Sequence, residues 1–226
     1  AAISLTELKD NKAAKKTDGR KIKSIRGIPK LMDANWAGST RSAQCILILC
    51  EGDSAKAGIV SGLSKDDRNI YGVFPLKGKL MNVLDINQAK LNSNAEIANI
   101  KKIMGLETAQ EYKSIEEVNK RLRYGKVLFM TDQDLDGAHI KGLCLNLFHS
   151  QWHDLIKMES FLGFMNTPII KATKGSHVKS FYYEKEYEDW KESNNDGKGW
   201  KIKYYKGLGT SCAKEFKEYF RDKKEV

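Results

Sequence analysis

The stretch KVLFMTDQDLDGAHI, residues 126–140, decides the fold of this 226-residue chain. An apolar run at 127–130 ends abruptly in three aspartates spaced by two, Asp132, Asp134 and Asp136. A short apolar run of this kind predicts a buried strand. In open α/β sheets, ligands bind outside the carboxyl ends of the strands. Because three like charges repel one another, a cluster in that place favours a bound cation.

The acidic cluster allows two other interpretations. An EF-hand loop begins D-x-D-x-D-G, as residues 132–137 do, but its twelfth position supplies a bidentate glutamate. Here that position is Leu143, and the preceding segment is strand-like, which disfavours an EF-hand. Three aspartates in a solvated turn are the second alternative. That alternative explains poorly why the cluster directly follows a core strand.

Another carboxylate follows a second predicted strand. The run CILILC at 45–50 ends in Glu51, and Asp53 or Ser54 can then cap a helix to about residue 63. If the two strands are parallel neighbours, about 4.8 Å apart, Glu51 and Asp132 lie at one edge of the sheet. Carboxylates suit Mg²⁺, and two such ions about 3.5–4 Å apart clamp the oxygens of a phosphodiester displacement.

The pattern along the whole chain predicts an α/β fold. Further elements are expected as a strand at 70–74, a helix over 82–104 broken near 92–94, a helix from the capping box of Ser114 and Glu117 to 122, and a helix over 139–157. This alternation predicts a mostly parallel sheet with helices on both faces. Beyond 158, the expectations are a strand pair or long strand at 161–171, strands at 181–183 and 201–205, a loop at 194–199, and helices at 184–193 and 213–224.

Composition narrows the class of protein. The 39 Lys and Arg against 29 Asp and Glu give a net charge of +10, which favours a polyanionic partner, nucleic acid first. A solvated basic surface is the alternative. Residues 1–43 are expected to be a poorly structured basic linker, either lying on phosphates or forming a mobile tether. No run approaches the roughly 18 apolar residues of a membrane span, and no signal peptide is recognisable.

Two further features bear on the origin of the chain. It begins with Ala-Ala rather than Met, which suggests a piece excised from a longer protein. Its four cysteines are scattered without a CxxC pair. We therefore expect reduced thiols of an intracellular protein rather than zinc ligands.

Four ordered motifs resemble the Toprim region of type IIA DNA topoisomerases. They are EGDSA at 51–55, PLKGKLMNV at 75–83, TDQDLDGAHIKGL at 131–143 and YYKGLGTS at 204–211. With IKSIRGIPKLMDANWAG at 22–38 leading in, the chain looks closer to the eukaryotic DNA topoisomerase II branch than to bacterial gyrase. The resemblance covers about residue 22 to the end. It implies a Rossmann-like Toprim sheet, with a basic linker at 1–43, an α/β core at 44–158 and an α+β extension at 159–226.

The resemblance implies roles for the four carboxylates. Glu51 is expected to ligate metal and to act as general acid and base at the ribose 3′-oxygen. Asp132 is expected to be shared by two Mg²⁺ sites, and Asp134 to complete the second. Asp136 is expected to support the metals less directly, through water or a neighbouring ligand. The implied ions are two Mg²⁺, with Mn²⁺ or Ca²⁺ as substitutes.

The resemblance also implies DNA contacts near the cleavage site. The residues concerned are Lys77, Gly78, Lys79, Asn82, His139 and Lys206. His139 has a structural role as its alternative, and the loop at 206–210 is either a backbone-phosphate loop or a structural turn. Two departures from the family pattern are Lys77 in place of the usual Arg and Ala138 in place of a common Ser. Lys cannot stack or bind bidentately as Arg does, so base or drug stacking at residue 77 is in question.

The family implies parts that this sequence does not match. Its nucleophile is a tyrosine on a following winged-helix domain, and its ATP-hydrolysing domain lies upstream. The expected function is ATP-dependent cleavage, passage and religation of double-stranded DNA by a homodimer, in the nucleus of a cellular eukaryote or the cytoplasm if viral. The isolated chain is not expected to cleave DNA. The alternatives are another Toprim nuclease or primase, and a DNA-binding or subunit-interaction module with a structural metal site.

Overall fold

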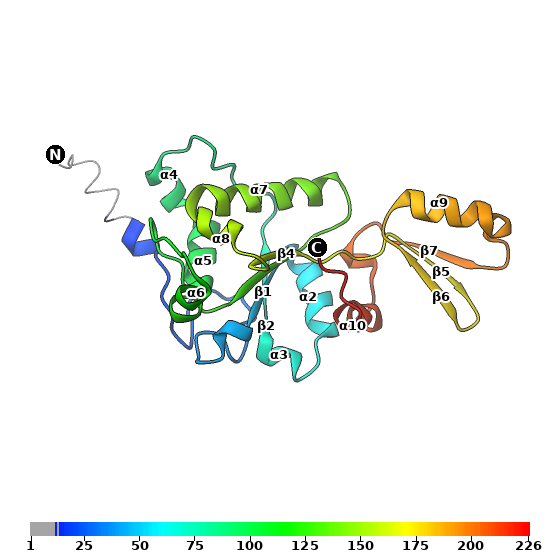
Figure 1. The fold of residues 1–226 in the computed structure, drawn as a ribbon, viewed down its shortest axis with the longest axis horizontal. Coiled ribbons are helices and arrows are strands. Elements are labelled where there is room, and N and C mark those ends of the chain that lie inside the picture. Colours follow the sequence, from blue (N-terminus) through cyan, green and yellow to red (C-terminus); the bar gives the residue numbers. More distant parts are fainter. Residues whose placement is uncertain (1–11, 13) are drawn as a thin grey trace.

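A computed structural model describes residues 12 and 14–226 of the chain (Figure 1). A parallel sheet with helices on both faces forms the larger part. A smaller antiparallel sheet with one covering helix extends from it to one side. The α/β class predicted from the alternation of apolar runs is therefore confirmed.

The larger sheet has four parallel strands in the order β2-β1-β3-β4. Their bounds are β1 Ile46–Glu51, β2 Tyr71–Leu76, β3 Lys126–Met130 and β4 Leu162–Phe164. The central strands β1 and β3 are direct neighbours, with Cys50 in register with Met130. The chain leaves β1 toward β2 on one side and leaves β3 toward β4 on the other. The carboxyl ends of β1 and β3 thus form the switch point at which open α/β sheets bind ligands.

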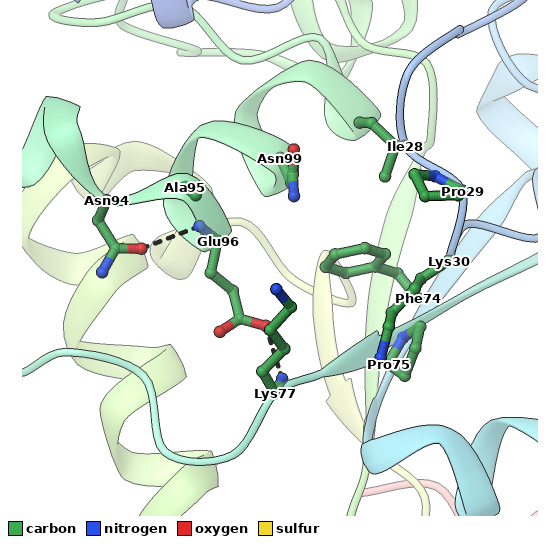
Figure 2. A pocket seen from close by; sticks show the side chains of 10 residues that line it. All are labelled: Ile28, Pro29, Lys30, Phe74, Pro75, Lys77, Asn94, Ala95, Glu96 and Asn99. Atoms are coloured by element: carbon green, nitrogen blue, oxygen red, sulfur yellow. Dashed lines mark hydrogen bonds between the residues drawn. The ribbon is translucent and has the colours of Figure 1, made fainter.

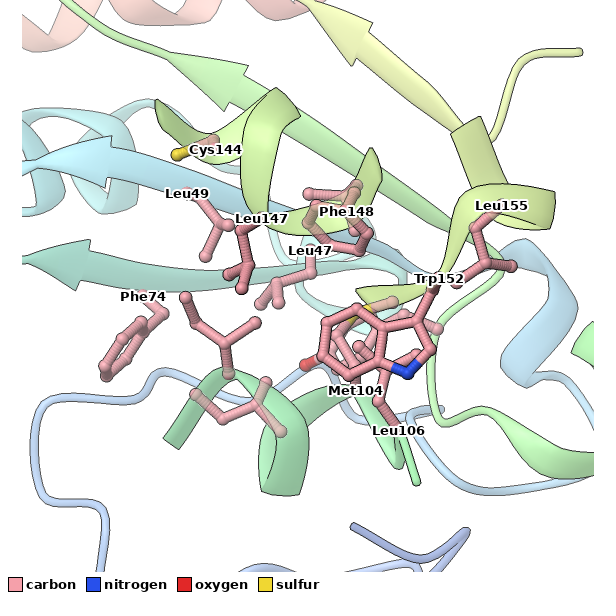
Figure 3. Close-up of a cluster of buried hydrophobic side chains, with 14 of the residues drawn as sticks. Leu47, Leu49, Phe74, Met104, Leu106, Cys144, Leu147, Phe148, Trp152 and Leu155 are labelled. Carbon is pink, nitrogen blue, oxygen red and sulfur yellow. The ribbon is translucent and has the colours of Figure 1, made fainter. Parts of the chain in front are cut away.

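Alternating side chains of these strands feed two separate cores. Leu47 and Leu49 point to the face covered by α5 and α7, where Leu147, Phe148 and Trp152 pack over the sheet (Figure 3). Ile48 and Cys50 point to the opposite face, which α2 and α10 cover. The helices of this part are α2 Gly52–Gly62, α3 Asp67–Ile70, α4 Gln88–Ser93, α5 Ala95–Met104, α6 Ile115–Arg121, α7 Leu135–Gln151 and α8 His153–Lys157.

The smaller sheet has its own aromatic core. Its antiparallel strands follow the order β6-β5-β7, with β5 Ile170–Lys174, β6 His177–Phe181, β7 Lys201–Tyr204 and helix α9 Glu184–Ser193. Phe181, Tyr187 and Trp190 are buried between α9 and the sheet. The chain then returns to the larger part through α10 Ala213–Arg221, whose Phe216 packs against α2.

Several expected boundaries were wrong. Residues 82–87 are not helical, because the Asn82 side chain accepts the N–H of Leu84 and Asn87 caps α4. Helix α7 begins at residue 135 rather than 139, and it ends before Trp152, whose backbone is not helical. The segment 161–171 splits into β4 and β5, which belong to different sheets. Strand β6 lies at 177–181 rather than 181–183, and α10 ends at 221.

The N-terminal segment is largely irregular, as expected, but it packs against the core. A helical turn spans residues 14–17, and Met32 forms an antiparallel bridge to Val73 of β2. Ala34 and Ala37 are buried. The alternative of a mobile tether is therefore wrong for residues 14–43. The part of the expected linker at 1–11 and 13 lies outside the described residues.

Residues 12 and 14–226 contain neither a membrane-spanning helix nor a disulfide. No helix in this range is long and apolar enough to cross a membrane. Cys45, Cys50, Cys144 and Cys212 are all free thiols, and only Cys212 is exposed. Burial raises the pKa of the Cys50 and Cys144 thiols to about 12, which keeps both protonated at neutral pH.

Candidate metal centre

The carboxyl edge of β1 and β3 brings Glu51 and the three aspartates together, as the two-strand argument predicted. Glu51 is the last residue of β1, and Asp132 follows the end of β3 by two residues. The negative charges of Asp132, Asp134 and Asp136 all act on the Glu51 carboxyl. The cluster is therefore built from both central strands rather than from a single loop, and the EF-hand is excluded.

Of the four carboxylates, Glu51 is the one with a buried oxygen, Oε2, that has no hydrogen-bond partner among the described residues. Burial, followed by the charges of Asp132 and the other two aspartates, raises the pKa of this carboxyl, and Lys79 opposes the rise. An unpaired buried carboxylate oxygen is costly, and a divalent cation would supply the missing partner.

The three aspartates differ in what holds them. Asp132 Oδ1 accepts the backbone N–H of Leu208 at 2.7 Å. Asp134 is the N-cap of α7, with its Oδ1 accepting the N–H of Gly137 at 2.7 Å. Asp136 lies in the first turn of α7 and pairs with Lys79 at 2.8 Å. The hydrogen bond from Lys79, and then the charge of Lys79, lower the pKa of Asp136.

These contacts show whether the carboxylates are already arranged to hold a metal ion. In the part of the chain that the structure describes, no group of three His, Cys, Asp or Glu side chains stands ready to hold a metal ion. Asp132 and Asp134 each spend one oxygen on a backbone N–H. Glu51, Asp132 and Asp134 offer only carboxylate oxygens, the donor type that a hard cation such as Mg²⁺ prefers. The residues present therefore fit a divalent metal.

Of the predicted DNA-contacting residues, Lys79, His139 and Lys206 lie beside this cluster. Gly78 has φ of 121°, a conformation that favours glycine and turns the chain after β2. Lys79 ties this turn to Asp136, and Asn82 Oδ1 accepts a hydrogen bond from the side chain of Asn146 on α7. His139, on the second turn of α7, is exposed. Lys206, in the loop that contacts Asp132, is also exposed.

A pocket of about 350 Å³ lies beside the turn after β2, not at the carboxylates (Figure 2). The pocket is lined by Ile28 and Lys30 of the N-terminal segment, Phe74 of β2, Lys77 and Glu96 of α5. Glu96 Oε1 accepts the N–H of Lys77 at 2.7 Å. This backbone contact fixes the chain at the end of β2. None of the four clustered carboxylates lines the pocket, so the pocket is distinct from the candidate metal centre.

The loop at 206–210 was the functional feature that the sequence left most open. The loop was predicted to be either a backbone-phosphate loop or a structural turn. The structural turn is supported, because the Leu208 N–H donates to the Asp132 carboxylate of this chain. Glu215 forms hydrogen bonds to residues on both sides of the loop. It accepts hydrogen bonds from Lys203 at 2.9 Å, from the Tyr205 hydroxyl, and from the N–H of Cys212 at 2.8 Å.

Glu215 should make the stability of the chain depend on acid pH. Burial acts to raise the pKa of this carboxyl, but the hydrogen bonds from Tyr205, Lys203 and Cys212 lower it from 4.5 to about 2. Since the folded pKa is depressed, the contribution of Glu215 to stability is present above pH 4.5 and is lost as pH falls toward 2. We expect Glu215→Gln to flatten the fall in unfolding free energy over that window, measured by urea denaturation. Parallel pH profiles for the two proteins would contradict this assignment.

Comparison with known proteins gives the class that this fold and site define. Residues 46–163 match the profile described as the Toprim domain, and residues 165–226 match the C-terminal associated domain of TOPRIM. The chain belongs to the Toprim family.

The relatives narrow the family to one branch. The chain is 54% identical over 207 residues to DNA topoisomerase 2 of Drosophila melanogaster, covering 92% of this chain and 14% of that protein. It is 53% identical over 208 residues to DNA topoisomerase 2-beta of Homo sapiens, covering 92% of this chain and 13% of that protein. The predicted resemblance to eukaryotic-type DNA topoisomerase II is confirmed. The chain spans about one seventh of the length of these relatives.

A solved structure gives the same result. The crystal structure of the Plasmodium falciparum topoisomerase II DNA-binding, cleavage and re-ligation domain superposes with a TM-score of 0.82 and 54% identity. The match covers 89% of this chain and 27% of that one. Toprim domains of topoisomerases bind divalent metal ions in general, which agrees with the oxygen donors gathered at β1 and β3.

Proposed function

We propose that this chain is the metal-binding Toprim part of a type IIA DNA topoisomerase. The observation that carries the proposal is the buried Oε2 of Glu51 at the switch point of the sheet. It has no hydrogen-bond partner among the described residues, and the charges of three aspartates act on its carboxyl. The relatives and the basic net charge of +10 support a DNA substrate. In the whole protein, ATP-dependent double-strand cleavage, strand passage and religation would follow.

In this proposal Glu51, Asp132 and Asp134 hold two Mg²⁺ ions, with Mn²⁺ or Ca²⁺ as substitutes. Asp136 supports them from the first turn of α7. When bound, the ions would stabilise negative charge on the phosphate and the ribose 3′-oxygen. The charged groups of this chain that act on Glu51 are the three aspartates and Lys79, and carboxylate oxygens are the donors that a hard cation prefers.

The proposed step is a displacement at phosphorus. The phenolate of a tyrosine outside these 226 residues attacks the phosphodiester, forming a 5′-phosphotyrosyl bond and breaking the bond to the 3′-oxygen. Glu51 delivers a proton to that oxygen and removes it again during religation. Burial and the neighbouring aspartates raise the pKa of its carboxyl, which favours the protonated form that donates in this step.

The remaining assignments concern the DNA and the assembly. We propose that Lys77, Gly78, Lys79, Asn82, His139 and Lys206 lie along the DNA backbone near the cleaved bond. The positions of Lys79, His139 and Lys206 beside the acidic cluster support this, and Lys77 contributes phosphate attraction without the stacking of an arginine. We also propose a homodimer, acting in the nucleus of a cellular eukaryote or in the cytoplasm if the protein is viral.

Glu51→Gln in the full-length enzyme tests this function. The substitution keeps the shape of the side chain and removes its charge and its acid–base capacity. We expect a loss of about 10²–10⁴-fold in the rate of covalent DNA cleavage, the range typical of a general acid–base group. Glu116→Gln, an exposed carboxylate at the start of α6, is the matched control.

Two results would point to the alternative functions. Unchanged cleavage by Glu51→Gln would favour an interaction module whose metal site is only structural. Metal-dependent nicking of DNA by the isolated chain would favour a nuclease or primase, because neither requires the missing tyrosine.

A further inference from the structure

The loop at 206–210 touches the proposed metal ligand Asp132 at two places. The Leu208 N–H donates to Asp132 Oδ1 at 2.7 Å, joining residues 76 positions apart. On the other oxygen, a Cβ added at Gly207 would lie 2.3 Å from Asp132 Oδ2 and 2.7 Å from Cγ. No side chain can occupy that space without displacing the carboxylate.

The glycine at 207 is explained by this close approach and not by its backbone. Gly207 has φ of 177° and ψ of 176°, an extended conformation that any residue adopts. A Cβ added at Gly209, two residues further on, would meet nothing within 4 Å among the described residues. The two glycines of one loop therefore differ in their contact with Asp132.

The loop is held in place by contacts that do not involve Asp132. Thr210 donates to the Gly207 carbonyl oxygen twice, from its N–H at 3.0 Å and from Oγ1 at 2.6 Å. The Leu208 side chain is 2% exposed, in the core shared with α2 and α10. Glu215 accepts hydrogen bonds from Lys203 before the loop and from Cys212 after it. Because the loop is fixed independently, it can impose a position on the carboxylate.

We propose that Gly207 and the Leu208 N–H are positioning groups that orient the Asp132 carboxylate for metal binding. The Leu208 N–H binds Oδ1, and the bare Cα of Gly207 leaves room for Oδ2, so the loop fixes the orientation of the carboxylate. This inference rests on the proposed function, since it takes Asp132 as a metal ligand. It assigns a role in the metal centre to the C-terminal extension, which reaches the carboxyl edge of β3 through this loop.

The test is Mn²⁺ binding to full-length protein, followed by electron paramagnetic resonance, for Gly207→Ala and its control Gly209→Ala. Groups that orient a metal ligand change metal affinity by about 10–100-fold. We expect that loss in Gly207→Ala and wild-type affinity in Gly209→Ala. Equal Mn²⁺ affinities in the two variants would overturn the proposal.

A second pair of variants keeps the test independent of any steric damage at residue 207. Thr210→Val removes the Oγ1 hydrogen bond to Gly207, whereas Thr210→Ser retains it. We expect weaker Mn²⁺ binding in Thr210→Val and wild-type binding in Thr210→Ser. Equal binding by Thr210→Val and Thr210→Ser would count against the positioning role.

Asp132→Ala separates this inference from the proposed function. If Asp132→Ala lowers Mn²⁺ affinity while Gly207→Ala does not, the positioning role fails and the metal centre stands. If Asp132→Ala itself binds Mn²⁺ as the wild type does, the metal centre fails, and the positioning role fails with it.

Discussion

Replacing Asp33 with Ala is expected to lower the free energy of unfolding by about 3–5 kcal/mol, the cost of leaving a buried charge without its partner. Arg123 has a fully buried side chain, and Asp33 is its counter-ion. The Arg123 Nη2 atom lies 2.5 Å from Asp33 Oδ2, and Nη1 lies 3.3 Å from Oδ1. The buried hydroxyl of Tyr124 also donates to Asp33.

The remaining contacts of Arg123 do not replace the lost carboxylate. Its Nε and Nη1 donate to the carbonyl oxygens of Ile22 and Ile103, which carry no full charge. Urea denaturation of Asp33→Ala against the wild type measures the effect. Asp66→Ala, an exposed aspartate with no side-chain bond among the described residues, is the control. A change below about 1 kcal/mol would show that the pair contributes no more than a surface ion pair.

Asp33 also illustrates what the sequence could not reveal. It lies within residues 1–43, which were predicted to be a poorly structured basic linker. Its partner Arg123 is 90 positions away, so no local periodicity or spacing connects the two residues. Lys101 presents the same case, because it is buried and pairs at 2.8 Å with Asp18 of that segment. Long-range charge pairs of this kind depend on the tertiary fold.

The gathering of the four carboxylates at one edge of the sheet was predictable because its signals are local. Each carboxylate group directly follows an apolar run, and parallel neighbouring strands bring the ends of such runs together. The boundaries near it were less predictable. Asp134 was considered only as a metal ligand, whereas its Oδ1 also begins α7 by accepting the Gly137 N–H. The N-cap role of Asp134 is a structural task that the sequence analysis did not predict.

Asp132→Ala in the full-length enzyme is expected to reduce DNA cleavage by more than about 100-fold. Changes in groups that merely support a metal ligand already cost about 10–100-fold, so the loss of a ligand should cost more. The fold should persist, because Asp132 is only half-buried and the core strand β3 ends before it. Alanine also leaves Leu208 without its acceptor, so circular dichroism accompanies the assay.

The decisive measurement is the yield of covalent protein–DNA complexes, trapped with denaturant, across a Mg²⁺ titration. Wild type and Asp66→Ala should form these complexes as Mg²⁺ is added. Asp132→Ala should remain more than about 100-fold lower at every Mg²⁺ concentration. Mg²⁺-dependent cleavage by Asp132→Ala at the wild-type level would contradict the assignment of a catalytic metal centre to the ends of β1 and β3.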